Sequence, residues 1–340
     1  MAELDVLLRQ VWHPVCTMAE LRSANPSGVG PLGVTLLGER LVIALVDATT
    51  VALADRCVHR STALSVGTVD SGGIRCAYHG WVYAPDGHCV EIPALPDGPI
   101  PARACVASYA ARIAYDLVWV CLDNRADLPL PACPAYGDTE LRVLAGAPYT
   151  WPVSAPRRVE NFVDLSHFAF VHDGSLGIRD EPVPPLPEIE RAPGELQFTY
   201  DPPDIEVDPT ALFGHQKYRM PMPCTVSIEF FLASGARRLL WMTASPVTLA
   251  TCRSFWFVAR SDAWDEPDEA HMAFQARILQ EDQPVVSAQN PPEMVLDPGV
   301  EVSVRTDKVS IEYRRWLREL VNAAASGPGE LRAALLFGRD

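Results

Sequence analysis

The sequence predicts an α+β protein with two domains, an all-β domain over residues 1–128 and a mixed domain with an antiparallel sheet over residues 129–340. Two observations carry this prediction. Short apolar strands separated by turn residues fill the stretch from about Gly33 to Asp123, and helical and alternating patterns share the rest of the chain. With 340 residues, 48% of them hydrophobic, the chain can form a core in each domain.

The strands of the first domain are expected as short runs between turns. They cover residues 34–37, then 41–46 after a turn at Gly38–Glu39, then 51–55 and 115–122. Residues 124–150 combine several prolines with acidic residues, and this composition indicates a connector.

The second domain begins with a helical segment at residues 157–172 and a proline-rich loop at 180–194. An antiparallel meander is expected from three alternating runs, residues 224–232, 237–244 and 251–258. Two helices then close the chain, one over about 269–280 and one that begins near Thr306 or Asp307, either of which suits an N-cap.

The charge of the chain excludes two classes of partner. The formal net charge is −15 at pH 7, and the arginines are scattered, so neither a nucleic acid nor an anionic membrane surface is expected to bind. No stretch has the roughly 18 uninterrupted apolar residues of a membrane span. The first residues, MAELDVLLRQVWHPV, lack the features of a secretion signal, which predicts a cytoplasmic protein.

The nine cysteines are odd in number and widely spaced, which argues against a disulfide framework and leaves metal ligation or core packing. Four of them have apolar, strand-like neighbours and are interpreted as small core residues: Cys105, Cys121, Cys224 and Cys252.

The strongest functional signal is a pair of short motifs, Cys57-Val58-His59 and Cys76-Ala77-Tyr78-His79. Two thiolates and two imidazoles make a four-ligand set, and zinc is one candidate for it. The surrounding residues, CVHR and CAYHGW, resemble the Rieske iron–sulfur family. This resemblance implies a [2Fe-2S] cluster with Cys57 and Cys76 on one iron and His59 and His79 on the other. Neither loop has the extra cysteine of respiratory Rieske proteins, which is typical of the oxygenase and ferredoxin branch.

The segment NFVDLSHFAFVH, residues 161–172, is mostly apolar yet carries groups that need partners when they are buried. Its pattern Asp164-x-x-His167-x-x-x-x-His172 resembles the catalytic motif of Rieske non-heme iron oxygenases. The resemblance implies that both histidines bind a mononuclear Fe(II) together with a distant aspartate. A regular helix would place the two histidines about 140° apart. A π-like turn or a helix end is therefore expected between them.

Five acids are candidates for the third ligand: Asp262, Asp265, Asp268, Glu281 and Asp282. Asp282 is the prediction, because a carboxylate at the C-terminal end of the helix 269–280 needs a compensating cation. The resemblance agrees, since in the O-demethylase branch the ligand aspartate follows a glutamate in a late helix, as in LQEDQPVV. The alternative is an exposed acid beside Pro284.

The resemblance gives two further residues of this segment a role. Asp164 would bridge the cluster histidine of one subunit, here His79, to the iron-bound His167 of its neighbour in a homotrimer. A plain acid at a helix N-terminus is its alternative. Asn161 matches a position near the iron in demethylase relatives, with a helix-capping or packing amide as the alternative.

The resemblance runs from VWHPV near the start to DKVSIEYRRWL in the last helix, and is nearest to vanillate and dicamba O-demethylases and phenoxybenzoate dioxygenase. It implies a helix-grip (START-like) catalytic domain and the oxygenase component of a multicomponent monooxygenase. Electrons from NAD(P)H would arrive through a flavin reductase, a ferredoxin or both, with O2 as cosubstrate. A small hydrophobic aromatic or polycyclic substrate would be hydroxylated or O- or N-demethylated.

Two other functions remain open from the sequence. A cis-dihydroxylating dioxygenase uses the same two centres. A non-catalytic Rieske electron carrier with a ligand-binding domain would hold only the two cluster irons. Iron content separates the second alternative from an oxygenase.

Two further sets of residues are expected to contact the electron donor and the substrate, respectively. Arg56, Arg60 and Arg75 flank the cluster loops and predict a basic rim for an acidic donor, or else a solvated surface. The residues proposed to line a substrate cavity also suit ordinary core packing: Phe213, Met220, Met222, Phe230, Trp241 and Trp256.

Overall fold

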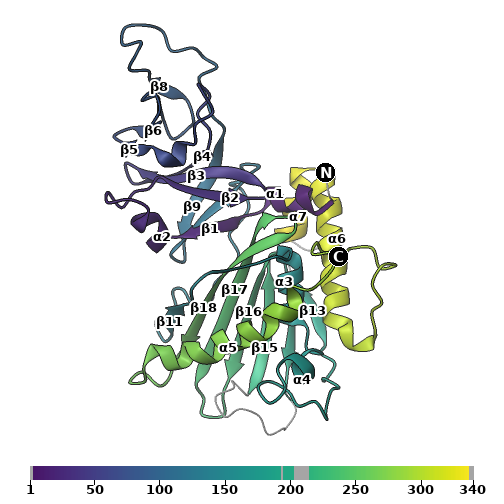
Figure 1. Cartoon of the computed structure of the whole chain (residues 1–340). Coiled ribbons are helices and arrows are strands. Elements are labelled where there is room, and N and C mark those ends of the chain that lie inside the picture. Colours follow the sequence, from purple (N-terminus) through teal and green to yellow (C-terminus); the bar gives the residue numbers. More distant parts are fainter. Residues whose placement is uncertain (1–2, 193, 203–213, 337–340) are drawn as a thin grey trace. The chain divides into compact units, whose positions relative to one another are not determined.

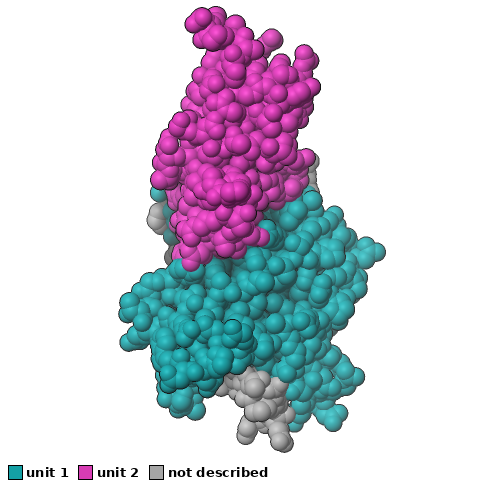
Figure 2. Space-filling view, turned by 60° about the vertical axis from the view of Figure 1, so that its left-hand side comes forward, with its two compact units in different colours: residues 1–7, 131–340 teal, residues 8–130 magenta. Residues whose placement is uncertain are grey.

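The computed structural model describes residues 3–192, 194–202 and 214–336. The chain divides into two compact units, residues 8–130 and residues 1–7 together with 131–340 (Figure 2). No helix in the described part of the chain combines the length and the apolar character needed to cross a bilayer.

The unit of residues 8–130 contains two antiparallel sheets (Figure 1). The larger has the order β1-β10-β9-β4-β3-β2, formed by β1 (His13–Thr17), β2 (Leu32–Leu36), β3 (Glu39–Val46), β4 (Thr49–Ala54), β9 (Ser108–Ala114) and β10 (Leu117–Cys121). The smaller is a meander of β5 (Thr68–Asp70), β6 (Gly73–Arg75), β7 (Val82–Tyr83) and β8 (Cys89–Glu91). The helices of this unit are α2 (Met18–Ser23) and the 3₁₀ turn η1 (Leu64–Val66). Helix α1 (Glu3–Gln10) is shared, because its residues up to Leu7 belong to the larger unit.

Strand β3 separates two hydrophobic cores. Val42 and Ala44 pack into a cluster that includes Cys57 and Cys76, and the alternate residues Leu41 and Ile43 pack into a second cluster. This period of two is expected of a strand that is buried on both faces. The two motif cysteines therefore belong to a packed core rather than to mobile loops.

The larger unit is built on one antiparallel sheet with the order β11-β18-β17-β16-β15-β14-β13, and β12 also pairs with β18. Its strands are β11 (Arg142–Ala145), β12 (Tyr149–Trp151), β13 (Ile189–Ala192), β14 (Glu195–Tyr200), β15 (His215–Pro221), β16 (Thr225–Phe231), β17 (Arg237–Thr248) and β18 (Thr251–Arg260). The expected meander is thus present, with longer strands β17 and β18.

The helices of this unit are α3 (Ala155–Val163), α4 (Phe168–Val171), α5 (Asp268–Val286), the 3₁₀ turn η2 (Arg305–Asp307), α6 (Lys308–Ser326) and α7 (Pro328–Leu336). Helix α3 packs on the central strands β16, β17 and β18. Helix α5 lies over the same sheet (Figure 1), and side chains of α5, β16 and β17 enclose one cavity between them. The last long helix begins directly after Asp307, as predicted.

Three expected elements differ from those observed. Residues 157–172 are not one helix, because Asp164 adopts an extended backbone (φ −76°, ψ 120°) that ends α3. The expected connector 124–150 contains β11 and most of β12, which have four and three residues. Both strands pair with β18. Helix α5 continues to Val286 rather than ending at 280, so it includes Pro284.

Candidate functional site

The two cysteine–histidine motifs form loops with the same backbone geometry. In the first loop the amide of Cys57 donates to the carbonyl of Thr62 at 2.8 Å, and Ser61 donates back to Cys57 at 2.9 Å. In the second loop Cys76 donates to Trp81 at 2.8 Å, and Gly80 donates back to Cys76 at 3.0 Å. Each loop is therefore closed by the same pair of hydrogen bonds, one to the fifth residue after the cysteine and one from the fourth.

The fourth residue of each loop has a left-handed backbone. Ser61 has φ 60° and Gly80 has φ 73°. At Gly80 a Cβ atom would also lie 2.9 Å from Cγ of Pro93, so this conformation favours glycine and the lack of space excludes a larger residue. These constraints explain the glycine of the CAYHGW motif in local structural terms.

The four donor side chains of these loops meet at one end of the unit. The imidazoles of His59 and His79 lie 4.4 Å apart between ring centroids, and His59 stacks on Trp81 at 4.6 Å. Burial, with the neighbouring thiol of Cys57, raises the pKa of the Cys76 thiol, and a cation bound beside it would favour its thiolate form. The Nδ1 atom of His59 is buried and has no hydrogen-bond partner among the described residues. This donor set suits an iron–sulfur cluster, and the exposed position of His79 suits electron transfer to a partner.

The predicted basic rim is smaller than expected. Arg75 is occupied inside the unit, where it forms ion pairs with Asp70 and Glu91 and donates to the carbonyl of Gly80 at 2.7 Å. It therefore braces the second loop. Arg56 and Arg60 are exposed, and Arg56 donates to the hydroxyl of Ser61 at 3.0 Å and 3.1 Å.

The second group of potential ligands is formed by His167, His172 and Asp282. One ligand atom from each lies within 4.8 Å of the others. The Oδ1 atom of Asp282 is 3.4 Å from Nε2 of His167 and 3.2 Å from Nε2 of His172. Two imidazoles and one carboxylate that converge in this way make the donor set of a two-histidine, one-carboxylate metal site.

The two histidines flank helix α4 instead of lying within one long helix. His167 is its N-terminal cap and His172 its C-terminal cap. A helix end therefore lies between the two histidines, as expected, because α4 stops at Val171. A further break, which was not expected, precedes His167, because α3 already ends at Val163 with Asp164 as its cap. A single short turn between two caps lets both rings face Asp282, which a regular helix would not.

Each imidazole has a carboxylate near its other nitrogen. Nδ1 of His172 lies 2.7 Å from Oε2 of Glu281, and this hydrogen bond orients the ring and leaves Nε2 for a metal. Nδ1 of His167 lies 3.7 Å from Oδ2 of Asp164, beyond hydrogen-bond distance, and has no hydrogen-bond partner among the described residues. Asp164 also accepts the backbone amide of Ser166 at 2.8 Å, and its side chain is about one third exposed (32%).

The electrostatics of the triad favour a bound cation. Burial alone would lower the pKa of His167, but the carboxylates of Asp164 and Asp282 outweigh it and raise this pKa to about 9. Burial alone would raise the pKa of Asp282, but the hydrogen bonds of the two imidazoles and the charge of Arg158 hold it far below its usual range. A buried carboxylate that stays ionised needs positive charge beside it, which a divalent metal supplies.

The placement of Asp282 corrects one argument made from the sequence. Because α5 extends to Val286, Asp282 lies within the helix and not beyond its end. Its side chain is only 6% exposed, so it is not the exposed acid that formed the alternative. The carboxylate faces the two histidines because of the tertiary packing of α5 against α4, more than because of the helix dipole.

Asn161 joins the triad to the body of α3. Its Nδ2 atom donates to Oδ1 of Asp282 at 3.1 Å, and its Oδ1 atom accepts from Nη1 of Arg158 at 2.6 Å. The amide neither caps a helix nor simply fills space.

A cavity of about 70 Å³ opens beside the triad. Its walls are mainly aromatic and aliphatic, and two amides, Gln216 and Gln275, add polarity. Further lining residues include Phe162, Phe168, Tyr218, Ile228, Phe230 and Leu240. A mostly apolar pocket with a few polar groups is the usual form of a small-molecule site.

Of the six residues proposed from the sequence to line a cavity, Phe230 is confirmed. Trp241 follows the cavity residue Leu240 on β17 and faces the other way, with its indole donating to the carbonyl of Ala132. Trp256 donates to Ala147 and packs against Gly146. Met220 and Met222 are not among the lining residues, and Phe213 lies outside the described residues. Of the four cysteines assigned to the core, Cys105 is only partly buried.

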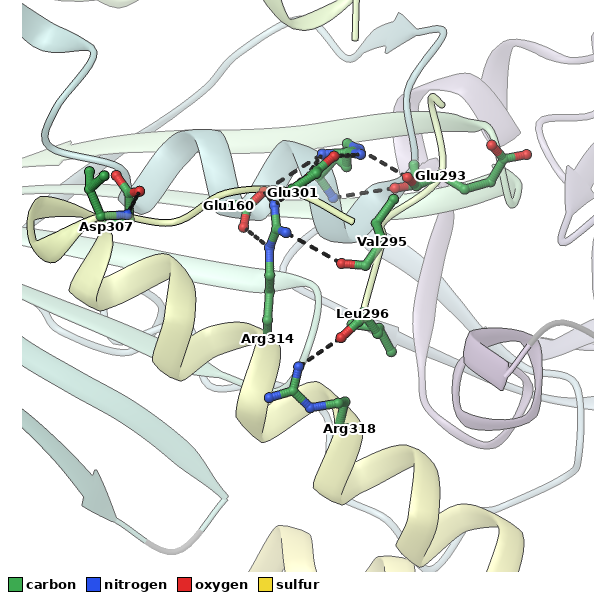
Figure 3. Close-up of polar contacts among 11 residues, drawn as sticks. Glu160, Glu293, Val295, Leu296, Glu301, Asp307, Arg314 and Arg318 are labelled. Carbon is green, nitrogen blue, oxygen red and sulfur yellow. Dashed lines mark hydrogen bonds and ion pairs between the residues drawn. The ribbon is translucent and has the colours of Figure 1, made fainter. Parts of the chain in front are cut away.

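A second cavity also borders the triad and is lined by Asp164, His167 and Asp282 and, from the segment of residues 287–304, by Gln289, Glu301, Val302 and Ser303. An ion network fixes this segment (Figure 3). Arg314 of α6 pairs with Glu160 of α3 and, at 2.7 Å, with Glu301, which also pairs with Arg157 at 2.6 Å. Arg318 donates to the carbonyl of Leu296 at 2.7 Å.

Three residues that line the cavity were not predicted from the sequence: Arg158, Gln216 and Gln275. A signal existed for Arg158, which stands three positions before Asn161 and so on the same face of a helix. No pattern distinguished the two glutamines, because only the folded sheet and helix bring them to one cavity.

Comparison with known proteins supplies independent findings. Residues 151–323 match the family described as vanillate O-demethylase oxygenase C-terminal domain, and residues 11–110 match the Rieske [2Fe-2S] domain family. Methylxanthine N3-demethylase NdmB of Pseudomonas putida is 44% identical, covering 97% of this chain and 94% of that protein. Methylxanthine N1-demethylase NdmA of Pseudomonas putida is 42% identical, covering 97% and 93%.

Solved structures give a consistent result. The structure of Pseudomonas putida CBB5 NdmA with caffeine superimposes with a TM-score of 0.93 at 41% identity, covering 98% of this chain and 97% of that one. Dicamba monooxygenase bound to dicamba gives a TM-score of 0.80 at 23% identity, covering 94% and 99%, which is a likeness of fold.

Proposed function

This chain belongs to the Rieske non-heme iron oxygenase family, and from that premise we propose that it is the terminal oxygenase of an N-demethylating system that acts on methylxanthines or closely similar N-methyl heterocycles. The observation that carries the enzyme class is the convergence of His167, His172 and Asp282 within 4.8 Å beside a largely apolar cavity. A Rieske electron carrier without catalysis would need neither feature.

Each unit has its own proposed metal group. Residues 1–128 form the cluster domain, in which Cys57 and Cys76 hold one iron and His59 and His79 the other. Residues 129–340 form the catalytic domain, in which His167, His172 and Asp282 hold Fe(II). The paired loop geometry and the buried, unpartnered Nδ1 of His59 support the first assignment. The facing Nε2 atoms of the two histidines support the second.

The cavity and the relatives together support the substrate class. Flat aromatic walls fit a planar ring system, and the amides of Gln216 and Gln275 can donate to ring carbonyls or accept from ring N–H groups. The two curated relatives that cover nearly the whole chain are named as N1- and N3-demethylases of methylxanthines. An N-methyl group held near the triad is therefore the proposed point of reaction.

The main tasks of the protein in this reaction are to hold the metal groups and to position the substrate. When bound, the cluster supplies single electrons and the mononuclear iron activates O2 for insertion into a C–H bond. One substrate C–H becomes C–OH, while O2, two electrons and two protons also yield one water. The resulting N-hydroxymethyl group then releases formaldehyde and leaves an N–H. The side chains of the cavity position the methyl group and exclude bulk water.

The proposed partners are an electron donor and further copies of this chain. A reductase that uses NAD(P)H, with or without a ferredoxin, would deliver electrons to the exposed edge of the cluster near Arg56, Arg60 and His79. Asp164 would accept His79 of a neighbouring copy within a homotrimer and so connect the two metal groups between subunits. The partial exposure of Asp164 supports this role, as does its position 3.7 Å from His167. The expected location is the cytoplasm.

The test is turnover of the purified protein with a surrogate reductase and NADH. Caffeine, theobromine, theophylline and vanillate are supplied separately, and products are identified by mass. Loss of one CH2 from a methylxanthine, with formaldehyde formed in equal amount, is the expected result. A gain of two oxygens and two hydrogens would indicate dihydroxylation. Demethylation of vanillate alone would reject the N-methyl substrate class.

A further inference from the structure

Arg158 is a fully buried cation at the wall of the cavity, and the contacts that the structure gives it are all with neutral groups. Its Nε donates to the hydroxyl of Tyr149 at 2.8 Å and its Nη1 to Oδ1 of Asn161 at 2.6 Å. The rings of Trp151 and Phe162 lie 4.7 Å and 5.0 Å from its Cζ. Burying a guanidinium costs several kcal/mol unless it is compensated. A role at the neighbouring site would account for its presence.

The contact with Arg158 fixes the orientation of the Asn161 amide. The oxygen and nitrogen of an asparagine amide have nearly the same shape, so their hydrogen-bond partners decide which atom is which. An arginine can only donate hydrogen bonds. The atom of Asn161 that faces Nη1 at 2.6 Å must therefore be its carbonyl oxygen. Its NH2 group is then left to face Asp282, to which it donates at 3.1 Å.

Asn161 in turn restrains the carboxylate that closes the triad. Oδ1 of Asp282 is the atom that contacts Nδ2 of Asn161 and both imidazole Nε2 atoms. A fixed N–H donor on this oxygen limits rotation of the carboxylate and thus the lone pair that it presents to a metal. The positive charge of Arg158 also helps to hold the pKa of Asp282 below its usual range.

We propose that Arg158 is a positioning residue: it sets the amide of Asn161, and Asn161 sets Asp282 as a metal ligand. The proposal rests on the metal assignment of the proposed function and adds a residue that acts on the metal ligand Asp282 through Asn161. An arginine is needed because its planar fork holds Tyr149 and Asn161 at once while its faces pack on aromatic rings.

The test measures Co(II) binding at the mononuclear site. The full chain with its oxidised cluster, which gives no EPR signal, is freed of mononuclear iron and titrated with Co(II) against a chelator. Affinity and the EPR line shape of high-spin Co(II) are recorded for the parent, Arg158→Gln and Asn161→Leu. Both variants are expected to bind Co(II) about tenfold or more weakly and with an altered line shape.

Arg157→Gln is the matched control. It removes a buried guanidinium from the same helix, but one that pairs with Glu301, the carbonyl of Glu293 and, at 4.0 Å, Glu160 rather than with Asn161. The control is expected to lose stability but to keep the Co(II) affinity and line shape of the parent. A merely structural effect of losing an α3 arginine would instead change both variants alike and overturn the proposal.

The remaining outcomes are also decisive. Parent-like binding and line shape in Arg158→Gln, with or without an effect of Asn161→Leu, overturns the role of Arg158. If Arg158→Gln does not fold, Arg158→Lys decides, because lysine keeps the charge but cannot hold both partners and should weaken binding by a smaller factor. An unchanged lysine variant then overturns the proposal. If the parent itself binds no Co(II), the metal assignment fails, which is distinct from failure of this inference.

Discussion

The Nδ1 atom of His172 lies 2.7 Å from Oε2 of Glu281, although 109 positions separate the two residues. The carboxylate is held from its other side by the hydroxyl of Ser175 at 3.3 Å. Glu281 and Asp282 are adjacent on α5, so one helix supplies both the outer partner of His172 and the proposed ligand beside it. This arrangement makes the site sensitive to each of the two acids in a different way.

Replacement of Glu281 by glutamine should weaken metal binding without abolishing it. The amide can still contact His172, but it lacks the negative charge that fixes the tautomer and raises the basicity of Nε2, so mononuclear iron should bind about 10- to 100-fold more weakly. Chelator competition measures the change. Glu269→Gln, an exposed acid on the same helix, is the control and should match the parent. Equal affinity for mononuclear iron in Glu281→Gln and the parent would contradict the proposal that Glu281 supports His172 as a ligand.

Replacement of Asp282 by alanine should remove the mononuclear iron and leave the cluster in place. The chain should then retain two of three iron atoms and the visible absorbance of the Rieske cluster while losing demethylation. Iron analysis and absorbance of the same sample provide the check. Loss of the cluster absorbance together with the third iron would show that the two groups are not held by separate sets of residues.

Replacement of Arg314 by glutamine should destabilise the larger unit strongly. Removal of the guanidinium leaves the buried Glu160 and the partly buried Glu301 without one of their cations, at a cost of about 3 to 5 kcal/mol. Urea unfolding measures the loss. Arg315→Gln is the matched control on the same helix, because Arg315 is 55% exposed and pairs only across the surface with Glu312. Its effect should stay within about 0.5 kcal/mol.

The double variant Glu160→Gln with Arg314→Gln tests the same network from the other side. It removes one charge of each sign, so part of the loss should be recovered relative to Arg314→Gln alone. If the double variant loses as much unfolding free energy as the Glu160→Gln and Arg314→Gln variants lose together, Glu160 and Arg314 do not interact energetically.

The stability of the smaller unit should fall as the pH drops through the range of His13. Burial lowers the pKa of His13 from 6.5 to about 4, while its hydrogen bond to the carbonyl of Leu8 raises it somewhat. The unfolded chain therefore binds the proton first. Above about pH 6.5 the contribution of neutral His13 is complete, and between there and pH 4 on the order of 3 kcal/mol is lost.

His13→Gln isolates this effect, because glutamine can still donate to Leu8 but does not titrate. The difference in unfolding free energy between parent and variant should change in the variant's favour between about pH 7.5 and about pH 5. A difference that stays constant over this range would show that folding does not lower the pKa of His13.

Charge reversal at Arg56 and Arg60 should slow reduction of the cluster by an acidic donor and reduce its dependence on salt. Both side chains are exposed beside the first cluster loop. Stopped-flow reduction at several ionic strengths measures this. Arg112→Glu, on β9 of the same unit, provides a comparison away from the loops. Unchanged kinetics in the double reversal would place the donor on another surface.

The sequence predicted the chemical groups of both sites more securely than their geometry. The spacing within CVHR and CAYHGW predicted the cluster donors because each loop carries its proposed ligands only a few residues apart. The long cavity strands were likewise expected from their alternation, and the last helix was expected to begin near Thr306 or Asp307. In contrast, the break of the helix at Asp164 depends on one extended backbone position that the pattern of apolar residues did not reveal.

By itself, then, the sequence determined the two-domain α+β class, the two sets of ligand types and the candidate acids, since these follow from local spacing and residue chemistry. Only the tertiary structure decided that Asp282 rather than the other acids faces both histidines, that Gln216 and Gln275 share a cavity with Phe230, and that Arg158 reaches Asp282 through Asn161. The physical reason is that such contacts join residues about a hundred positions apart. Their geometry depends on how helices pack on a sheet, and no local pattern in the chain records that packing.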